Sequence, residues 1–391
     1  MRIAWVALLA GACGFHAGAA TDGGAVDASP GLDVPIAIDT HVGSDASPPI
    51  DTAFDSPVVD AASARKRISI TVPTVAGTQH DFPMWVDVNQ ADFQAANASG
   101  SDIYFTDATG APIAYQIQSY DGAHHLQAWV KVGALTNNSM LYLCFGDASM
   151  TQPQDPAGTF SNGFSAVWHL EDTLADGNPI ADATGTHDGS DVGLDATHAV
   201  TTTLGKGIEF DGADSTMITF TNPLSGATTH TISLWITTTG NTGADNDAMI
   251  VMGDTTEQAE ESRWFHARFG ESQDVALGFY GDDWTTTGEN IETATPHLLH
   301  WVFEGNNTKS HLYVDGTEIG TYNHHNNVNT QGTAGYIGWA PGAFGQNMGL
   351  HGIVDEVRIS TDARDANWVA TEWANQSSPS TFYQLSAAAS F

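Results

Sequence analysis

Two segments in the C-terminal half of the chain combine an aromatic ring with acid or amide groups. They are residues 280–284, which read Tyr-Gly-Asp-Asp-Trp, and residues 339–347, which run from a Trp to an Asn. Proteins bind sugars by stacking aromatic faces on apolar C–H patches, while nearby polar groups bond the hydroxyls. Both segments look like loops and favour glycan recognition, although the two tryptophans could equally be core or rim residues. The candidate ligand-binding residues are Trp284, Trp339, Asp283 and Asn347.

Groups that would break bonds are hard to find in this sequence. No Gly-x-Ser-x-Gly nucleophile motif, His-Glu-x-x-His motif or zinc-type Cys/His spacing occurs. Asp355 and Glu356 are adjacent in a strand-like run, so we expect them on opposite faces rather than paired. The histidine pairs at 124–125 and 324–325 lie in polar turns, and three acids between 257 and 261 lie in a loop. We therefore predict no catalytic residues and no enzyme activity.

The net charge of the chain limits the classes of molecule that it could bind. The chain has 391 residues, with 11 Lys+Arg against 46 Asp+Glu, so its formal net charge is −35. Phosphate groups would be repelled, which argues against nucleic acid and anionic lipid. The only cysteines are Cys13 and Cys144, so a disulfide framework is excluded. Cys144 lies in an apolar run and is expected to be a small buried side chain.

The first 20 residues look like a secretion signal. A charged start precedes a short apolar run that ends at Cys13, and this run is shorter than the about 20 residues that span a bilayer. The segment resembles a bacterial lipobox, in which the cysteine is lipidated, while the alternative is cleavage after residue 19, which would remove Cys13. We expect a lipid anchor at Cys13 as the only membrane contact, in an outer-membrane lipoprotein facing the outside, or else a secreted protein.

Residues 21–63 change character and are expected to form a disordered linker. They are rich in Asp, Pro and Ser, and Asp recurs every six residues from Asp27 to Asp51. Such a segment cannot bury enough apolar surface to offset its ordering entropy. A calcium-binding Asp repeat would need a glycine-rich nonapeptide pattern, which is missing. A stalk that lifts a folded module off a surface is the better interpretation.

Alternating apolar and polar residues then predict an all-β chain of two modules. Residues 64–152 contain about six short strand-like runs, which indicates a small β-sandwich. Residues 160–391 contain eleven or more, which indicates two large packed sheets. The Asp-Gly pair at 315–316 predicts a hairpin. Residues 364–373 predict one short amphipathic helix, whose aromatic side chains we expect to plug the end of the second sandwich.

The first module resembles DUF2341, a family of unknown function. The resemblance rests on residues 101–107 (Ser-Asp-Ile-Tyr-Phe-Thr-Asp), 128–132 (Ala-Trp-Val-Lys-Val) and 141–147 (Leu-Tyr-Leu-Cys-Phe-Gly-Asp), in the order and spacing of the family. Cys144 and Asp147 depart from its usual Tyr and Asn. The family has no assigned catalytic residues, so the resemblance implies a fold but no chemistry.

The second module is similar to the laminin-G/concanavalin A-like jelly-roll superfamily. Five separated motifs carry the similarity, at residues 210–212, 232–236, 300–302, 312–316 and 352–360. Members often hold one structural Ca²⁺ at the sandwich rim, bound by carboxylate and carbonyl oxygens. The resemblance implies Asp182, in a Gly-rich loop, and Asp355, in the last long strand, as its ligands. Alternatively, Asp182 and Asp188 are turn residues, and Asp355 pairs with Arg358 or caps a strand. The superfamily's hydrolase pattern, Glu-x-Asp-x-x-Glu, is absent.

These features lead to one principal hypothesis and two alternatives. The principal hypothesis is a surface-tethered extracellular binding protein whose jelly roll recognises a glycan. One alternative is a non-catalytic structural or adhesion protein that binds surface proteins. The other, less favoured, is a glycoside hydrolase.

Overall fold

The computed structural model describes residues 65–150, 152–213, 215–239, 247–255, 262–270, 274–286, 291, 293–305, 308–339 and 349–391. The predicted signal segment with Cys13, the predicted linker and Asn347 lie outside these residues. The described residues belong to one compact unit, Pro57–Phe391. None of the helices in the described part is long and apolar enough to cross a membrane.

The first module is a sandwich of two antiparallel sheets, as predicted. Alternating burial along β1 puts every second side chain into the core between the sheets. One sheet has the strand order β23-β1-β6-β3, with β24 also paired to β1, and the other has the order β2-β5-β4. The strands are β1 (Lys66–Val72), β2 (Gln79–Asn89), β3 (Tyr104–Asp107), β4 (Tyr115–Tyr120), β5 (His125–Leu135), β6 (Ser139–Phe145), β23 (Gln384–Leu385) and β24 (Ala389–Ser390).

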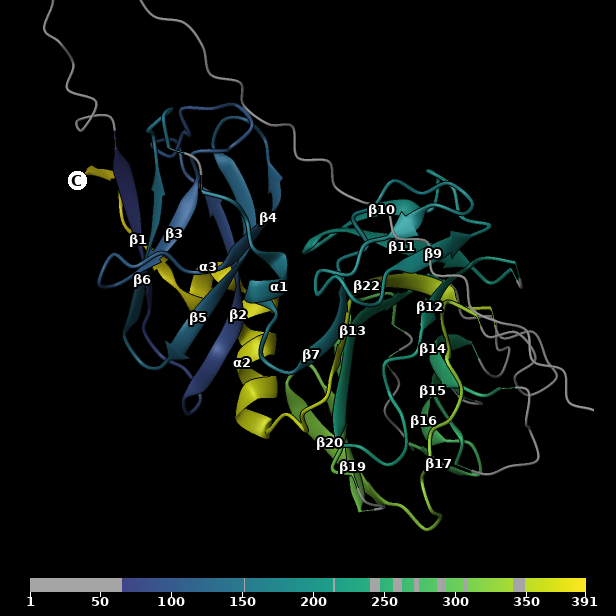
Figure 1. The fold of residues 1–391 in the computed structure, drawn as a ribbon. Coiled ribbons are helices and arrows are strands. Elements are labelled where there is room, and N and C mark those ends of the chain that lie inside the picture. Colours follow the sequence, from purple (N-terminus) through teal and green to yellow (C-terminus); the bar gives the residue numbers. More distant parts are fainter. Residues whose placement is uncertain are drawn as a thin grey trace, which may run out of the picture. The chain divides into compact units, whose positions relative to one another are not determined.

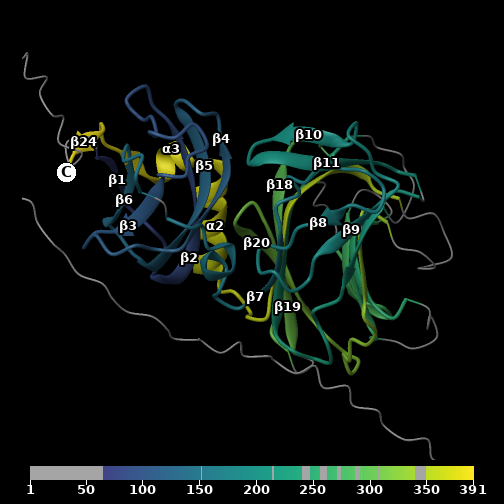
Figure 2. The same cartoon turned by 45° about the horizontal axis from the view of Figure 1, so that its top comes forward.

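The second module is a jelly roll of two packed antiparallel sheets, which confirms the all-β fold class (Figure 2). Its strands are β7 (Phe164–Trp168), β8 (Pro179–Ile180), β9 (Gly189–Val192), β10 (Ala199–Thr202), β11 (Gly205–Asp211), β12 (Met217–Thr221), β13 (His230–Thr238), β14 (Ala248–Gly253), β15 (Trp264–Phe269), β16 (Val275–Phe279), β17 (Asp282–Thr285), β18 (His297–Phe303), β19 (Lys309–Val314), β20 (Thr317–Asn323), β21 (Ala334–Ile337) and β22 (His351–Ser360).

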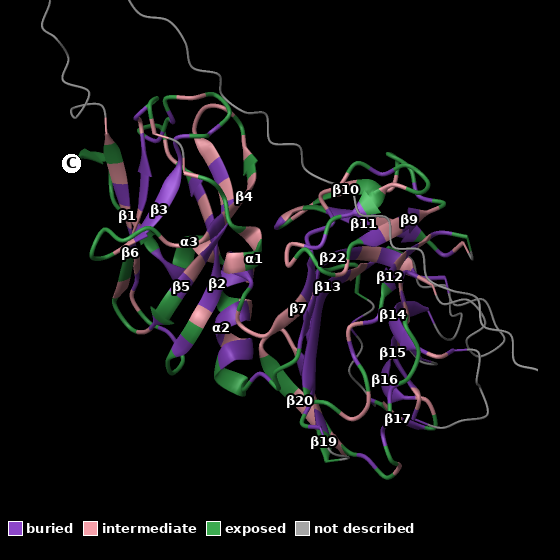
Figure 3. Cartoon of the chain, viewed as in Figure 1, coloured by how far each residue is buried: buried purple, intermediate pink, exposed green. Residues whose placement is uncertain are grey.

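We call its two sheets the junction sheet and the distal sheet. The junction sheet has the order β10-β11-β22-β13-β18-β19-β20, with β7 beside β22. The distal sheet has the order β17-β16-β15-β14-β21-β12-β9-β8. Strand β13 is buried along almost its whole length, because one face lies in the core and the other is covered (Figure 3). The predicted hairpin is confirmed: Asp315 and Gly316 have φ of 51° and 76° between β19 and β20.

Three helices complete the described part of the chain: α1 (Pro156–Thr159), α2 (Ala366–Ser377) and α3 (Pro379–Phe382). The predicted C-terminal helix is α2, and it begins where the Asp365 carboxylate accepts a hydrogen bond from the Trp368 N–H at 2.8 Å. Helix α2 contacts β2 of the first module and β20 of the junction sheet (Figure 1). It therefore bridges the two modules.

The C-terminal segment completes the first module, which corrects our expectation that residues 160–391 form the jelly roll alone. Leu385 pairs with Ile70 of β1, and Ser390 pairs with Lys66. Most aromatic residues of this segment do not plug the jelly roll, because Trp368, Phe382 and Tyr383 lie in the core of the first sandwich. Trp373 alone among them packs on the jelly roll, with 5.4 Å between its ring centroid and that of Trp235. The physical reason is that β1 would otherwise be an unpaired sheet edge.

Candidate functional site

The outer face of the distal sheet carries side chains that are unusual for a solvent-facing sheet. Along β15, Phe265 and Ala267 point into the core between the sheets. Strand alternation therefore places Trp264, His266 and Arg268 on the opposite face. The same segment thus supplies both core residues and a row of aromatic and basic groups.

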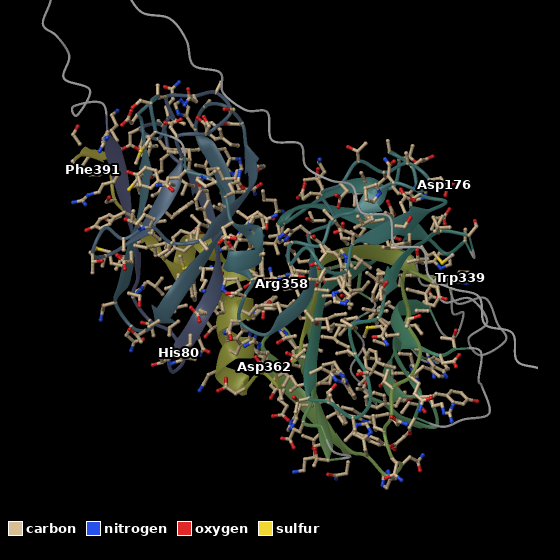
Figure 4. All side chains as sticks on the ribbon, viewed as in Figure 1. His80, Asp176, Trp339, Arg358, Asp362 and Phe391 are labelled. Atoms are coloured by element: carbon tan, nitrogen blue, oxygen red, sulfur yellow. The ribbon has the colours of Figure 1, made fainter. Side chains whose placement is uncertain are left out.

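An aromatic cluster lies on this outer face, and we call its members Val251, Trp264, Tyr280 and Trp339 the aromatic face. The rings of Trp264 and Tyr280 stack at 5.1 Å between centroids, with an interplanar angle of 14°. Trp264 is fully buried, whereas Tyr280 and Trp339 are half-buried. Figure 4 shows Trp339 on this side of the jelly roll, away from Arg358. The face therefore presents partly accessible rings over a packed base.

A charged pair lies beside these rings. The Asp283 carboxylate is 3.6 Å from the Arg268 guanidinium and 3.9 Å from Nε2 of His266, and its side chain is 31% exposed. Burial, followed by the charge of Arg268, holds the pKa of His266 well below its usual value, so this imidazole is neutral at pH 7. Asp283 and Arg268 thus offer an acceptor and donors next to aromatic rings.

Trp284 does not belong to this face, which corrects the expectation of a loop at 280–284. Residues 282–285 form the edge strand β17, so Asp283 and Trp284 point to opposite sides of the sheet. Trp284 packs against the core between the sheets and stacks on Tyr322, with 6.3 Å between ring centroids. A Cβ at Gly320 would lie 2.6 Å from its ring. Trp284 is a rim filler.

Asp182 and Asp355, which the resemblance implies as calcium ligands, have different surroundings in the structure. The Asp182 carboxylate accepts hydrogen bonds from the backbone N–H groups of Val167, Thr184, Thr186 and His187, at 2.8–3.1 Å. Its oxygens therefore hold the 182–187 loop together. Asp182 and Asp355 each line a cavity, but the two cavities are separate. Within the described ranges no group of three or more His, Cys, Asp or Glu side chains could hold a metal ion.

Asp355 and Glu356 lie on the same face of β22, which corrects the sequence expectation. Glu356 has φ of 51°, and the pairing of β13 with β22 shifts register at this point. Such a β-bulge turns two consecutive side chains to one side. Both carboxyls are buried on the outer face of the junction sheet, while Val354 and Val357 both point into the core.

The two carboxyl groups differ in environment. Glu356 lies 2.8 Å from His169 Nδ1 and accepts a hydrogen bond from Arg358 at 2.8 Å. Burial alone would raise the pKa of Glu356, but His169 and Arg358 outweigh it and hold that pKa below its usual value. For Asp355, burial and then the charge of Glu356 raise the pKa well above its usual value. The alternative that Asp355 pairs with Arg358 is therefore wrong, because Arg358 pairs with Glu356 and Glu372.

A buried polar network, which the sequence pattern does not predict, joins the junction sheet to α2 and to the first module. Arg358 donates to Glu372 at 3.0 Å, and its guanidinium lies 4.1 Å from the ring centre of Trp129 in β5. The Asn375 side chain of α2 bonds the backbone of Trp85 in β2. Its amide oxygen accepts from the Trp85 N–H at 2.7 Å, and its NH2 group donates to the Trp85 carbonyl at 2.9 Å. Glu372 is a charged residue on the apolar side of a short helix. Charged residues are seldom buried without a partner, so this feature of the sequence could have indicated a buried network.

Comparison with known families agrees with both resemblances. Residues 99–171 match the domain of unknown function DUF2341, and residues 211–370 match the concanavalin A-like lectin/glucanases superfamily. No match was found among curated proteins.

Several solved structures are similar to part of this chain. Domain 4 of AbnA, a GH43 extracellular arabinanase from Geobacillus stearothermophilus solved with arabinotriose, is 18% identical with a TM-score of 0.42, over 54% of this chain and 98% of that one. Trypanosoma rangeli sialidase in complex with sialic acid is 13% identical with a TM-score of 0.42, over 68% of this chain and 44% of that one. The binding domain of Paraclostridial Mosquitocidal Protein 1 is 12% identical with a TM-score of 0.41, over 54% of this chain.

The chain spans 52% of the length of that binding-domain structure. At these identities and TM-scores the likeness says nothing about ligands. The two family matches, in contrast, fall on part of the first module, continuing through β7, and on part of the jelly roll, in the order that the sequence predicted. The chain thus carries a match to DUF2341 at residues 99–171, followed by a match to the concanavalin A-like lectin/glucanases superfamily at residues 211–370.

Proposed function

We propose that this protein binds a glycan on the outer face of the distal sheet and performs no bond-breaking step. The observation that carries the proposal is the aromatic face beside the Asp283–Arg268 pair. Sugar rings stack on half-buried aromatic side chains such as Trp339 and Tyr280. Their hydroxyl groups need hydrogen bonds, which a carboxylate and a guanidinium supply. Because those groups are already paired and partly buried, the site is preorganised for a neutral polar ligand.

The setting of this activity is also a proposal. Cys13 as a lipid anchor and the acidic 21–63 segment as a stalk would display the jelly roll outside the cell, as the sequence suggests. Metabolic labelling with a palmitate analogue tests the anchor: incorporation that disappears in Cys13→Ser supports it, and labelling that persists in this variant or never occurs refutes it.

A second candidate function is a rigid structural or adhesion scaffold. The observation that favours it is the buried network at the junction, in which Arg358 and Glu372 are 1% and 3% exposed. Strands β23 and β24 also tie the end of the chain to the first module. In that case the jelly roll would hold a fixed orientation for a surface-protein partner, and the aromatic face would bind no sugar.

A glycan array probed with the full chain separates these candidates. We expect binding to a defined set of glycans, reduced at least tenfold in Trp339→Ala and in Asp283→Asn. The matched control is Asp362→Asn. Asp362 also pairs with an arginine, Arg364, at 3.7 Å, but it belongs neither to the aromatic face nor to the charged pair beside it. Silence across the array would favour the scaffold. Release of reducing sugar from a polysaccharide would overturn the non-catalytic part of the proposal.

A further inference from the structure

A cavity lies on the outer face of the junction sheet. Its volume is about 270 Å³, slightly below the roughly 300 Å³ at which ligand pockets usually begin. Its lining includes Trp235 and Thr237 of β13, Asp355 of β22, Thr202 of β10, Thr203 of the turn between β10 and β11, and Pro296 of the loop before β18. The size suits a single monosaccharide-sized molecule rather than a longer chain.

Asp355 is the distinctive group in this cavity. It is 3% exposed, and its Oδ2 accepts a hydrogen bond from the Thr202 hydroxyl at 2.6 Å. Its Oδ1 is buried and has no hydrogen-bond partner among the described residues. Gly207 of β11 permits the close approach of β22, since a Cβ there would lie 2.7 Å from the Val354 carbonyl oxygen and 3.2 Å from the Asp355 Cβ. A buried acceptor without a donor is costly unless a ligand or a proton satisfies it.

The basic side chains near Asp355 are paired with other carboxylates. On its own strand, Glu356 carries a like charge, and Arg358 is bound by Glu356 and Glu372. On β7 and the loop that follows, His169 is paired with Glu356, and Glu171 is a further like charge.

The remaining elements that pack nearby add no free cation. On the β11 side, Lys206 lies 3.8 Å from Glu171. Before β18, His297 is paired with Asp315 at 2.8 Å. Asp355 therefore has no basic partner within the described ranges, and burial together with Glu356 raises its pKa.

We infer that this cavity binds a small hydroxylated primary amine, of the size of a hexosamine, whose ammonium group pairs with the Asp355 carboxylate. A cation satisfies the unpartnered oxygen and neutralises a charge that two neighbouring carboxylates disfavour. The Trp235 ring offers an apolar wall for C–H groups. Threonine side chains at the rim offer hydroxyls to a polyol. The site is independent of the aromatic face, because it lies on the other sheet.

The inference predicts a linkage between binding and protonation. The carboxyl of Asp355 is protonated in the free protein over a wider pH range than an ordinary Asp, and it must ionise to pair with an ammonium group. Binding of the amine therefore releases a proton from Asp355. The affinity should therefore rise with pH through the range in which the Asp355 carboxyl ionises, which lies above that of an ordinary Asp.

Isothermal titration of the full chain with glucosamine tests this, with glucose as the neutral isostere. We expect glucosamine to bind at least tenfold more tightly than glucose, and Asp355→Asn to abolish that preference. Thr203→Trp, at an exposed turn residue, should block the cavity while the carboxylate stays intact. Asp362→Asn is the matched control, because it removes a carboxylate that pairs with Arg364 and does not line this cavity, and it should leave glucosamine binding unchanged. Equal affinities for the two sugars, or full glucosamine binding by Thr203→Trp, would overturn the inference even if the glycan site on the distal sheet is real.

Discussion

Replacing Glu372 with Gln removes one negative charge from helix α2 without changing the shape of the side chain. Glu372 is 3% exposed and accepts hydrogen bonds from Arg358, Trp368 and Gln376, each at 3.0 Å. Its Oε2 also lies 3.1 Å from Nε2 of His300. Breaking a buried ion pair by removing one partner typically costs about 3–5 kcal/mol, because the remaining charge stays buried. We expect a loss of that size in the free energy of unfolding at pH 7.

The pH dependence gives a second, independent measure of the same interaction. Burial alone would raise the pKa of Glu372, but His300 and Arg358 outweigh it and hold that pKa at about 2, against an ordinary value of 4.5. Because the pKa is depressed in the folded state, the stabilisation is fully present above pH 4.5. It is lost as the pH falls from about 4.5 to about 2. The shift corresponds to roughly 3 kcal/mol, which agrees with the cost of breaking the pair.

Urea unfolding, followed by tryptophan fluorescence between pH 7 and pH 3, measures both effects. The wild-type protein should lose stability along this acid limb, and Glu372→Gln should start lower and lose less. The matched control is Glu318→Gln, because Glu318 also lies beside a histidine, His311, at 2.7 Å but is 39% exposed. We expect that control to lose less than about 1 kcal/mol. An unchanged free energy for Glu372→Gln at pH 7, or an acid limb as steep as that of the wild type, would refute the reasoning.

Two further predictions concern the end of the chain and calcium. Deleting residues 384–391 removes β23 and β24 from β1. It also removes two hydrogen bonds of 3.0 Å, one from the Ser69 N–H to the Ser386 hydroxyl and one from the Ser386 N–H to the Ser69 carbonyl. It should destabilise the first module by roughly 2–4 kcal/mol in a urea melt, and an unchanged midpoint would contradict the pairing. The structural calcium ion remains a prediction of the resemblance. It requires that EDTA lower the melting temperature and that added calcium restore it, so a melting temperature indifferent to both would count against the ion.

Part of the candidate glycan site could be located from the sequence, and part could not. Asp283 and Trp339 stand in polar, turn-rich segments, which favours a binding role, and both lie at the outer face of the distal sheet. Trp264 and Arg268 were missed because they alternate with core residues along β15, so their segment reads as an ordinary buried strand. Trp284 was misplaced, since an edge strand of four residues after a glycine resembles a loop.

The strand pattern, the Asp-Gly hairpin and helix α2 follow from the sequence itself, because each depends on residues that are close together along the chain. The face on which Asp355 and Glu356 lie was decided by tertiary structure, since the bulge exists only where β22 pairs with β13. The same holds for the C-terminal strands, whose partner β1 is separated from them by more than 300 residues. Periodicity encodes which side chains are buried, but it contains no information on which distant strand will bury them.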